Sequence, residues 1–536
     1  MNALDLRDPA ERLLGRVLRR QAEAAPDAPF VLADERRWSY AEANAAANAW
    51  ARGLRELGVR RGDTVAFLLR SSPDFVFATF GAMKLGAIWV PTNVDYKGTW
   101  LRESLEDSRA RVLVVEADLL PRVAEVAEGL PLERVVVRGG AASAPGLATL
   151  ALEEVAGKPG PEPDDAELGY GDTAAVLWTS GTTGRSKGVM QSHNAWVRSA
   201  LSGAGNSGAR AGDVMYCCLP MYNSAAWSAL VYRALVTALP VAVDAAFSVH
   251  SFWDRCRHYG ATQVFTLGAM HIYLWQAPPG PDDRRNSVRH ATMIPLPEAL
   301  IGAFKERFGI ETLDQGYGQS EVLGLLHRPD DGKPKKPGSL GQPLAGLEAR
   351  LFGDDDREVA PGEVGEFCVR PTEPHVIFNG YFNAPEATLA ACRNLWYHTG
   401  DLGRRDEDGD WFFVDRKSDF IRYKGRNVSS FAVEAAVAAH PAVAECAAHG
   451  VRAAELEHEA EIKVCVVLKP GTALAPEELA RFVNDTAPYF FVPRYVEFVS
   501  ELPRTPTLRV QKFKLRERGV TPETWDRERA GFVVKR

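Results

Sequence analysis

A run of glycine and hydroxyl residues follows directly on an apolar segment that is typical of a β-strand. The apolar segment covers residues 174–178, and the run reads Thr-Ser-Gly-Thr-Thr-Gly-Arg-Ser-Lys-Gly-Val over residues 179–189. Its three glycines leave backbone N–H groups free to converge on phosphate oxygens, its hydroxyls add donors, and Lys187 supplies a cation. A Walker loop would end in Gly-Lys-Ser/Thr and open a helix, whereas Gly188 and two apolar residues follow the lysine here. The run therefore predicts a phosphate-binding loop of another type at the end of a strand.

Helical-looking segments rich in alanine, leucine and arginine alternate with short β-branched runs over residues 10–135, for example at 64–69 and 111–115. This alternation is typical of α/β layering, and it resumes through residues 261–266. Around residues 346–370 the pattern changes to short strands and turns, which indicates an all-β subdomain.

The C-terminal part of the chain predicts a compact unit of its own. After residues 411–416 the pattern indicates a helix at 434–440, a strand at 461–468 and a helix at 476–486. A chain of 536 residues also exceeds what one hydrophobic core usually spans. We therefore expect at least two domains, with a hinge close to Arg416.

Composition excludes several classes of protein. The net charge is −7 and the basic residues are not clustered, so a nucleic-acid partner is not expected. The seven cysteines are spread widely with no C-x-x-C pair, which argues against a disulfide framework or a zinc site and favours reduced thiols. The first residues lack the order of a signal peptide, and the longest apolar stretch, Phe75–Pro91, contains Lys84 and is shorter than the ~20 residues of a membrane span. We therefore expect a cytoplasmic protein with no membrane span.

Two further motifs lie C-terminal to the glycine-rich loop. They read Gly-Tyr-Gly-Gln-Ser-Glu over residues 316–321 and Tyr-His-Thr-Gly-Asp over residues 397–401. Together with the loop, they resemble the superfamily that contains acyl-CoA synthetases, peptide-synthetase adenylation domains and luciferases. The resemblance covers nearly the full chain. Residues 511–516 and the tail Thr-Pro-Glu-Thr-Trp at 521–525 are most similar to the branch that includes crotonobetaine/carnitine-CoA ligases.

The resemblance implies an α/β fold with two domains. The expected N-terminal domain, residues 1–415, is large and has stacked sheets and a β-rich subdomain. The expected C-terminal domain, residues 416–536, is a small mobile α+β domain. The hinge is expected near residues 416–419, with Ser418 at the position where the family has aspartate or lysine.

The same resemblance implies roles for the motif residues. The Ser320 hydroxyl would meet the phosphate, Glu321 would hold magnesium, and the Tyr317 ring would flank adenine. The Asp401 carboxylate would accept hydrogen bonds from both ribose hydroxyls, and Arg416 would also contact the ribose. The expected metal ligand is Glu321, and the expected nucleotide-binding residues are Thr179, Ser180, Gly181, Thr182, Thr183, Gly184, Lys187, Tyr317, Asp401 and Arg416.

Residues 415–430 are similar to the family's hinge and the loop that follows it. By that resemblance, the segment from Arg422 through Lys424 to Gly425 moves in after adenylation and lines the pantetheine tunnel. A glycine at position 425 fits this role because a tunnel wall leaves no room for a side chain.

The expected acyl pocket departs from the family in two places. Asn223 stands where acyl-CoA synthetases commonly carry histidine, which can titrate as asparagine cannot. Residues 291–296 are bulkier than the Gly-Gly-Ala-Pro-Leu type that the family packs beside adenine and the acyl group, and this change is compatible with loss of ATP use or with altered acyl specificity. The expected acyl-binding residues are Asn223, Ser224, Trp227, Gly268, Thr292, Ile294 and Gly316, with Trp227 equally compatible with core packing.

The main departure is Arg509. In the family, the loop after Leu-Pro-x-Thr-Pro-Thr carries Gly-Lys, and that lysine bridges the substrate carboxylate and the α-phosphate during adenylation. Here the motif Leu-Pro-Arg-Thr-Pro-Thr, residues 502–507, is followed by Leu508 and Arg509 in place of Gly-Lys. Arginine spreads its charge over a wide planar fork, so a site shaped for a compact ammonium need not accept it. Losing such an electrostatic clamp commonly costs ~10²- to 10³-fold in rate. The alternative that Arg509 or nearby Lys512 substitutes for the lysine remains open.

The sequence therefore predicts an acid–thiol ligase of the acyl-CoA synthetase type that forms acyl-CoA and AMP from an acyl-adenylate and CoA. The ATP-dependent adenylation half-reaction is expected to be weakened or lost, because the adenylation clamp is altered whereas the thioester-forming loop looks intact. The expected catalytic residues are Lys424, Gly425, Arg422, Arg509 and Ser320.

The expected ligands and partners follow from that reaction. The ligands are acyl-adenylate and AMP or ATP, CoA, and Mg²⁺ if adenylation occurs, and the acyl group comes from a small carboxylic acid. A separate adenylating enzyme would then supply the adenylate, and a homodimer is compatible with the class. Three alternatives stay open: a complete two-step ATP-dependent ligase, acyl transfer to a carrier-protein pantetheine, and a non-catalytic protein that binds adenylates or CoA.

Overall fold

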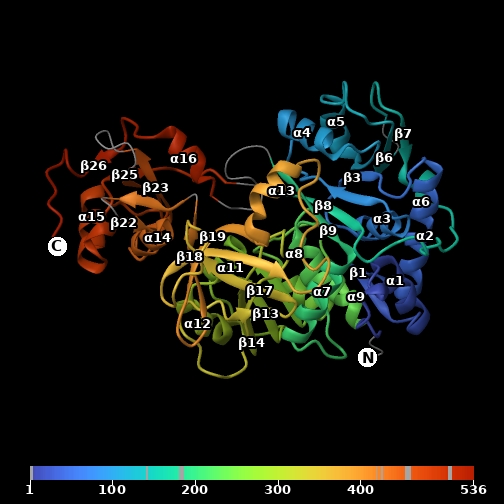
Figure 1. Ribbon diagram of the computed structural model, residues 1–536, viewed down its shortest axis with the longest axis horizontal. Helices are drawn as coiled ribbons and strands as arrows, with labels where there is room; N and C mark the ends of the chain where they lie inside the picture. The colour runs from blue at the N-terminus through green and yellow to red at the C-terminus, as the bar shows by residue number, and fades with distance from the viewer. Residues whose placement is uncertain are drawn as a thin grey trace. The chain divides into compact units, whose positions relative to one another are not determined.

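The computed structural model describes residues 4–140, 143–179, 186–417, 419–423, 426–452, 460–504 and 510–535. Within these residues the chain forms two compact units (Figure 1). The first unit comprises residues 4–179, 186–348 and 370–395, and the second comprises residues 349–369 and 396–535.

The first unit contains a seven-stranded sheet with the strand order β7-β6-β5-β3-β4-β8-β9. Its strands are parallel except for the antiparallel pair β8 and β9. The central strands are continuous apolar runs because both faces of this sheet are covered. The bounds are β3 (Thr64–Leu68), β4 (Ile88–Pro91), β5 (Val112–Glu116), β6 (Arg134–Arg138), β7 (Thr149–Ala151), β8 (Thr173–Thr179) and β9 (Lys187–Ser192).

A nine-stranded sheet follows the order β16-β15-β14-β13-β12-β10-β11-β1-β2. The run from β14 to β1 is parallel, and antiparallel strands flank it at both ends. The bounds are β1 (Pro29–Ala33), β2 (Arg36–Ser39), β10 (Met215–Cys217), β11 (Val241–Val243), β12 (Gln263–Leu267), β13 (His290–Ile294), β14 (Thr312–Tyr317), β15 (Leu326–Arg328) and β16 (Gln342–Pro343).

Helices cover these two sheets, and one hydrophobic core includes strands from both. Local sequence sets several helix starts: Ser39 and Glu42 form a capping box on α2, and Ser72 caps α3 ahead of Pro73. The bounds are α1 (Leu14–Ala24), α2 (Tyr40–Glu56), α3 (Pro73–Lys84), α4 (Gly98–Ser108), α5 (Leu120–Ala124), α6 (Leu152–Ala156), α7 (His193–Asn206), α8 (Ser224–Ala226), α9 (Tyr232–Thr237), α10 (Phe252–Tyr259), α11 (Ala269–Gln276), α12 (Glu298–Phe308) and α13 (Pro385–Ala391).

The second unit has its own core and three small sheets. The first sheet is ordered β17-β18-β19-β20, the second is the hairpin of β21 and β22, and the third is ordered β23-β24-β25-β26. The bounds are β17 (Leu347–Phe352), β18 (Val364–Pro371), β19 (Tyr397–Arg405), β20 (Trp411–Arg416), β21 (Ile421–Tyr423), β22 (Arg426–Val428), β23 (Val443–Arg452), β24 (Ala460–Leu468), β25 (Tyr495–Phe498) and β26 (Trp525–Asp526), with helices α14 (Ser430–Ala438), α15 (Pro476–Thr486) and α16 (Lys512–Arg518).

The expected α/β fold with several sheets, a β-rich part and a small α+β C-terminal part is confirmed. The helix expected at 434–440 is α14, which begins earlier, at Ser430, because Ser429 caps it. The expected boundary between residues 415 and 416 falls inside the second unit, which groups the β-rich sheet with the C-terminal segment. That boundary and the hinge at 416–419 stay predictions, and Ser418 lies outside the described residues.

The apolar stretch Phe75–Pro91 forms α3 and β4, and most of its side chains are buried in the core. Among the described residues, no helix has the length and hydropathy needed to cross a bilayer.

Candidate active site

Four neighbouring parallel strands bring the predicted acyl- and adenine-binding residues to one edge of the nine-stranded sheet. Gly268 follows the end of β12, Ile294 ends β13 and Tyr317 ends β14. Leu267 pairs with Ile294 in the β12–β13 ladder, so these strand ends lie level. Asn223 follows β10, the strand on the other side of β12. In open α/β sheets, ligands bind at the carboxyl ends of the parallel strands.

Two positions at this edge require glycine, each for a different physical reason. Gly268 has a φ of +52° where the chain turns from β12 into α11, a conformation that side chains rarely adopt. At Gly316 a Cβ atom would come within 2.6 Å of the Leu326 carbonyl oxygen, because β15 approaches closely there. Both positions therefore require glycine for the strand ends to keep this shape.

The bulky residues of β13 do not share one face. Met293 is fully buried in the core, whereas Thr292 and Ile294 are half-buried on the opposite face, as strand alternation requires. The Thr292 hydroxyl oxygen lies 3.3 Å from Nε2 of His290, a buried histidine whose pKa burial lowers to about 4. Only two of the three bulky residues can therefore face a ligand on the other side of the strand.

Trp227 lies within the aromatic core of the first unit. Its indole N–H donates to the Met221 carbonyl at 2.7 Å, and its ring centroid is 4.6 Å from that of Trp89. These contacts account for Trp227 as a core residue, and its place in an acyl wall stays a prediction. Asn223 and Ser224 lie where α8 begins, with Asn223 donating its backbone N–H to the Pro220 carbonyl.

His271 was not singled out from the sequence. It is fully buried, with Nδ1 3.0 Å from the Thr266 hydroxyl and Nε2 2.7 Å from the Pro295 carbonyl oxygen. It therefore joins β12 to the loop that follows β13. Burial lowers the pKa of His271 to about 4, so the ring is neutral near pH 7. The sequence signal that could have identified His271 is a histidine within the apolar run that forms α11.

Lys187 and Glu321, which belong to separate sequence motifs, both contact Tyr381. The Tyr381 hydroxyl donates to Glu321 Oε1 at 2.9 Å, and the Lys187 ammonium lies 5.0 Å from the centre of the Tyr381 ring. The Phe378 backbone N–H donates to the Glu321 carbonyl at 2.8 Å, and Val189 of β9 forms a β-bridge with Tyr381. The segment 378–382 thus contacts both the lysine of the glycine-rich loop and the predicted metal ligand.

Side chains also hold the backbone next to Glu321 and at Lys187. The Gln191 side-chain amide donates to the Ser320 carbonyl oxygen, which fixes the peptide that precedes Glu321. The Thr179 hydroxyl donates to the Lys187 carbonyl at 3.3 Å, where β8 and β9 pair. Gln191 and Tyr381 were missed in the sequence because neither lies in a recognised motif.

In the second unit, the structure brings the two predicted ribose-binding residues together. Asp401 pairs with Arg416 across β19 and β20, and Arg416 Nε is 3.7 Å from Asp401 Oδ1. The Asp401 backbone N–H donates to the Thr399 hydroxyl oxygen at 3.1 Å, and that hydroxyl donates to the Phe367 carbonyl at 2.8 Å. The turn that carries Asp401 is therefore tied to β18.

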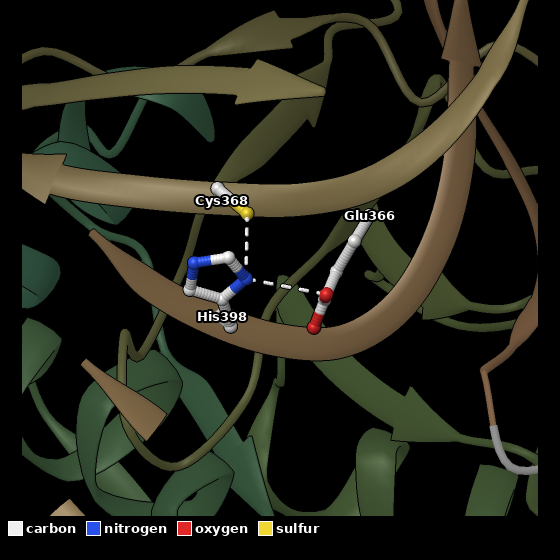
Figure 2. A group of neighbouring side chains, drawn as sticks. All are labelled: Glu366, Cys368 and His398. Carbon is white, nitrogen blue, oxygen red and sulfur yellow. Dashed lines mark hydrogen bonds and ion pairs between the residues drawn. The ribbon is translucent and has the colours of Figure 1, made fainter. Parts of the chain in front are cut away.

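Behind this turn lies a group that we call the Glu366 cluster, comprising the buried residues Glu366, Cys368 and His398 and the exposed Lys417. Figure 2 shows the first three, with Glu366 and Cys368 both directed at the His398 ring. His398 Nδ1 is 3.2 Å from Glu366 Oε2 and 3.3 Å from Cys368 Sγ. The Lys417 ammonium is 3.2 Å from the same Oε2, and the Gly400 backbone N–H donates to Glu366 Oε1 at 2.9 Å. His398 and Lys417 lie in segments that the sequence singled out, but no sequence motif pointed to Glu366 or Cys368.

Several predicted site residues lie where the structure gives no description. Ser180, Gly181, Thr182, Thr183, Gly184, Ser418, Lys424, Gly425 and Arg509 lie outside the described residues. Arg422 lies on β21, opposite Asn427 of β22. Lys512, which could replace the family lysine, has its ammonium 2.6 Å from the Ser430 hydroxyl oxygen and 2.8 Å from Glu434 Oε1.

Comparisons with known proteins agree with this arrangement. A family model described as "AMP-binding enzyme" matches residues 18–382, and one described as "AMP-binding enzyme C-terminal domain" matches residues 432–508. Crotonobetaine/carnitine–CoA ligases of Salmonella paratyphi A and Salmonella typhimurium are each 32% identical over 487 residues, which is 90% of this chain and 93% of the relative.

Solved structures are similar over almost the whole chain. An anthranilate CoA ligase, AuaEII, in complex with anthranoyl-AMP is 25% identical with a TM-score of 0.85, covering 94% of this chain and 96% of the other. The O-succinylbenzoate coenzyme A synthetase MenE from Bacillus subtilis, in complex with AMP, is 25% identical with a TM-score of 0.80, covering 93% and 98%.

Proposed function

Because the chain belongs to the family of AMP-binding enzymes and is of the acyl-CoA ligase type, we propose that it makes acyl-CoA and AMP from an acyl-adenylate and CoA, with adenylation weakened or lost. In that reaction the CoA thiol loses its proton to solvent, and its sulfur attacks the acyl carbonyl carbon. The C–S bond forms as the C–O bond to AMP breaks. AMP departs with the electron pair, so no covalent enzyme intermediate is needed.

The observation that carries adenylate binding is that Tyr381 contacts both Lys187 and Glu321. A cation and a carboxylate on neighbouring segments suit a phosphate and the divalent ion that accompanies it. Glu321 would hold Mg²⁺, since carboxylate oxygens are the ligands that this ion prefers, and the bound ion would neutralise phosphate charge. Asp401 and Arg416, adjacent on β19 and β20, support a ribose grip in the second unit.

The weakened adenylation rests on Arg509, in place of the family lysine. The contacts of Lys512 support this part of the proposal. Its ammonium is already engaged by Glu434 and Ser430 within the second unit, so replacing the lysine would require it to leave both partners. The segment 502–510 contains two cations, Arg504 and Arg509. Arg504 pairs with Glu445, which leaves Arg509 as the candidate to replace the family lysine.

A complete two-step ligase is the second candidate. The relatives that are 32% identical are CoA ligases by name, which favours a retained adenylation step. Transfer to a carrier-protein pantetheine and binding without catalysis are further alternatives.

One pair of assays separates these candidates. ATP–pyrophosphate exchange reports adenylation, and release of AMP from synthetic crotonobetainyl-AMP or anthranoyl-AMP in the presence of CoA reports thioester formation. We expect thioester formation with one of these adenylates and exchange that is about 10²-fold slower or absent. Robust exchange with the matching acid would establish the complete ligase.

Arg509→Lys is the companion variant. It restores a compact ammonium, so we expect exchange to rise by about tenfold or more while the rate of thioester formation stays within about twofold. If both rates match those of the wild type, Arg509 is not the cause. Adenylate binding without AMP release in any assay, with CoA or with phosphopantetheinylated carrier protein, would favour the non-catalytic alternative.

A further inference from the structure

A single carboxylate lies behind both halves of the predicted ribose grip. Glu366 on β18 is 4% exposed. Its Oε1 accepts the Gly400 backbone N–H at 2.9 Å, and its Oε2 lies 3.2 Å from both His398 Nδ1 and the Lys417 ammonium. A buried carboxylate needs such partners, because an uncompensated charge is strongly disfavoured away from water. Each oxygen of the Glu366 carboxylate therefore has a partner.

Two of these three partners are chain neighbours of ribose-grip residues. Gly400 precedes Asp401, and Lys417 follows Arg416. The Lys417 backbone N–H also donates to the Gly400 carbonyl at 2.8 Å, which ties the two neighbours directly to each other. Glu366 thus contacts the backbone next to Asp401 and the side chain next to Arg416, while the backbone bond from Lys417 to Gly400 joins the two strands.

His398 completes the arrangement from within the Tyr-His-Thr-Gly-Asp motif. Cys368 and Glu366 both reach the same ring nitrogen, Nδ1, as Figure 2 shows, and Nε2 is 3.9 Å from Asp356 Oδ1. The ring contacts Oε2 of Glu366, while Oε1 accepts the Gly400 backbone N–H, so the two carboxylate oxygens have separate partners.

The cluster also has the donor types of a metal site. Among the residues that the structure describes, Glu366, Cys368 and His398 are the one group whose three donor atoms all lie within 4.8 Å of one another. The Lys417 ammonium, however, contacts the Oε2 atom that faces His398, so a metal ion bound to this oxygen would lie close to a positive charge. Repulsion between the ammonium and a divalent ion disfavours a metal there. The geometry favours a hydrogen-bonded centre.

We propose that Glu366 is a positioning residue for the ribose grip: it holds Asp401 and Arg416 in the geometry that distinguishes ribose from 2′-deoxyribose. The inference rests on the proposed adenylate-binding function. A role limited to folding would change stability and overall affinity, whereas a positioning role also changes the discrimination between the two sugars.

The test measures dissociation constants of AMP and 2′-deoxy-AMP by calorimetry on the full chain. The wild type is expected to prefer AMP by about tenfold or more, since a hydroxyl bonded to a carboxylate contributes that much. Glu366→Gln keeps the shape but removes the carboxylate charge beside His398 and one of the two carboxylates that hold the Lys417 ammonium, the other being Asp354 at 2.9 Å. We expect its affinity for AMP to fall by about tenfold, with little change for 2′-deoxy-AMP, so that the preference collapses.

Glu363→Gln is the matched control, because Glu363 adjoins β18 and accepts the Ala360 backbone N–H at 2.9 Å outside the cluster. It should keep the wild-type preference. If Glu366→Gln does not fold, Lys417→Met tests the same link, since the Lys417 side chain is 41% exposed and its loss should also reduce the preference.

The outcomes are distinct. A wild type that binds neither nucleotide overturns the proposed function and, with it, this inference. A wild type that prefers AMP, together with a folded Glu366→Gln or Lys417→Met variant that keeps the full preference, overturns the inference alone. One equivalent of zinc that copurifies with the wild type and is lost in Glu366→Gln would also overturn it, in favour of a metal site.

Discussion

Tyr381 shows how one side chain can connect two motifs that are far apart in the sequence. Its hydroxyl donates to Glu321, and its ring lies beneath the Lys187 ammonium. Tyr381 and Glu321 are each 7% exposed, so the hydrogen bond is largely shielded from water. The hydroxyl therefore orients the carboxylate that would hold Mg²⁺, while the ring keeps the lysine close.

We predict that Tyr381→Phe separates these two contributions. The variant keeps the ring beneath Lys187 and removes only the hydrogen bond to Glu321, which leaves a carboxylate oxygen without that donor. The dissociation constant of Mg-ATP should rise about three- to tenfold, whereas that of AMP without metal should stay within about twofold. Fluorescence titration of both ligands checks the prediction.

Tyr170→Phe, which removes a hydroxyl elsewhere in the first unit, is the matched control and should change neither constant. Equal weakening of AMP and Mg-ATP in Tyr381→Phe would mean that the hydroxyl does not act through the metal ligand.

At the scale of elements, Asp415 joins the end of β20 to the start of α14. Its Oδ2 accepts the Ser430 hydroxyl at 2.8 Å and the Phe431 backbone N–H at 3.3 Å, and the Ser429 hydroxyl donates to the Val414 carbonyl at 2.8 Å. A carboxylate at a helix N-terminus satisfies backbone N–H groups and complements the helix dipole. The predicted hinge at 416–419 lies between these partners in the chain, so rotation about it requires this join to open.

We predict that Asp415→Ala loosens the first turn of α14 without unfolding the protein. Losing the cap should destabilise that turn by about 1–2 kcal/mol, so amide exchange over residues 430–434 should become about tenfold faster. Hydrogen-exchange mass spectrometry measures this directly. Glu407→Ala, at an exposed position in the turn between β19 and β20, should leave exchange in α14 unchanged. Unaltered protection in Asp415→Ala would show that α14 does not depend on this contact.

At the scale of the whole molecule, buried histidines are expected to set the acid limit of stability. Burial lowers the pKa of His193, His271, His290 and His449 to about 4. The unfolded chain would protonate these rings near pH 6.5, so between pH 6.5 and 4 it binds more protons than the folded chain. Their contribution to stability is complete above pH 6.5 and is lost as the pH falls towards 4.

The melting temperature should therefore decrease steadily from pH 7 to pH 5. Each of these histidines contributes on the order of 1 kcal/mol of lost stability at pH 5.5. His193→Asn can still accept the Leu14 backbone N–H, which donates to His193 Nδ1 at 3.3 Å, and should flatten the decrease. His250→Asn, at an exposed histidine, is the matched control and should leave the slope as in the wild type. A melting temperature that is constant from pH 7 to pH 5 would contradict the prediction.

The fold class could be predicted because it follows from the local pattern of apolar residues along the chain. β-branched runs alternating with helical segments predict parallel strands with crossover helices, and α15 was placed at its observed bounds, Pro476–Thr486. Start points were less accurate where a side chain decides them, as at Ser429 before α14. The grouping of the β-rich sheet with the C-terminal segment depends on long-range contacts that no local pattern reports.

For the candidate site, the sequence by itself determined the motif residues and the family, because glycines, hydroxyls and charges at set spacings report the chemistry that a loop can perform. It also showed Arg509 in place of lysine. Only the tertiary structure decided that Tyr381 lies between Lys187 and Glu321, that Trp227 and Met293 pack in the core, and that Glu366 lies behind Asp401 and Arg416. The physical reason is that these relations arise from strand pairing and side-chain packing between segments that are mostly far apart in the chain, and the residues next to a side chain in the sequence do not report its distant partners.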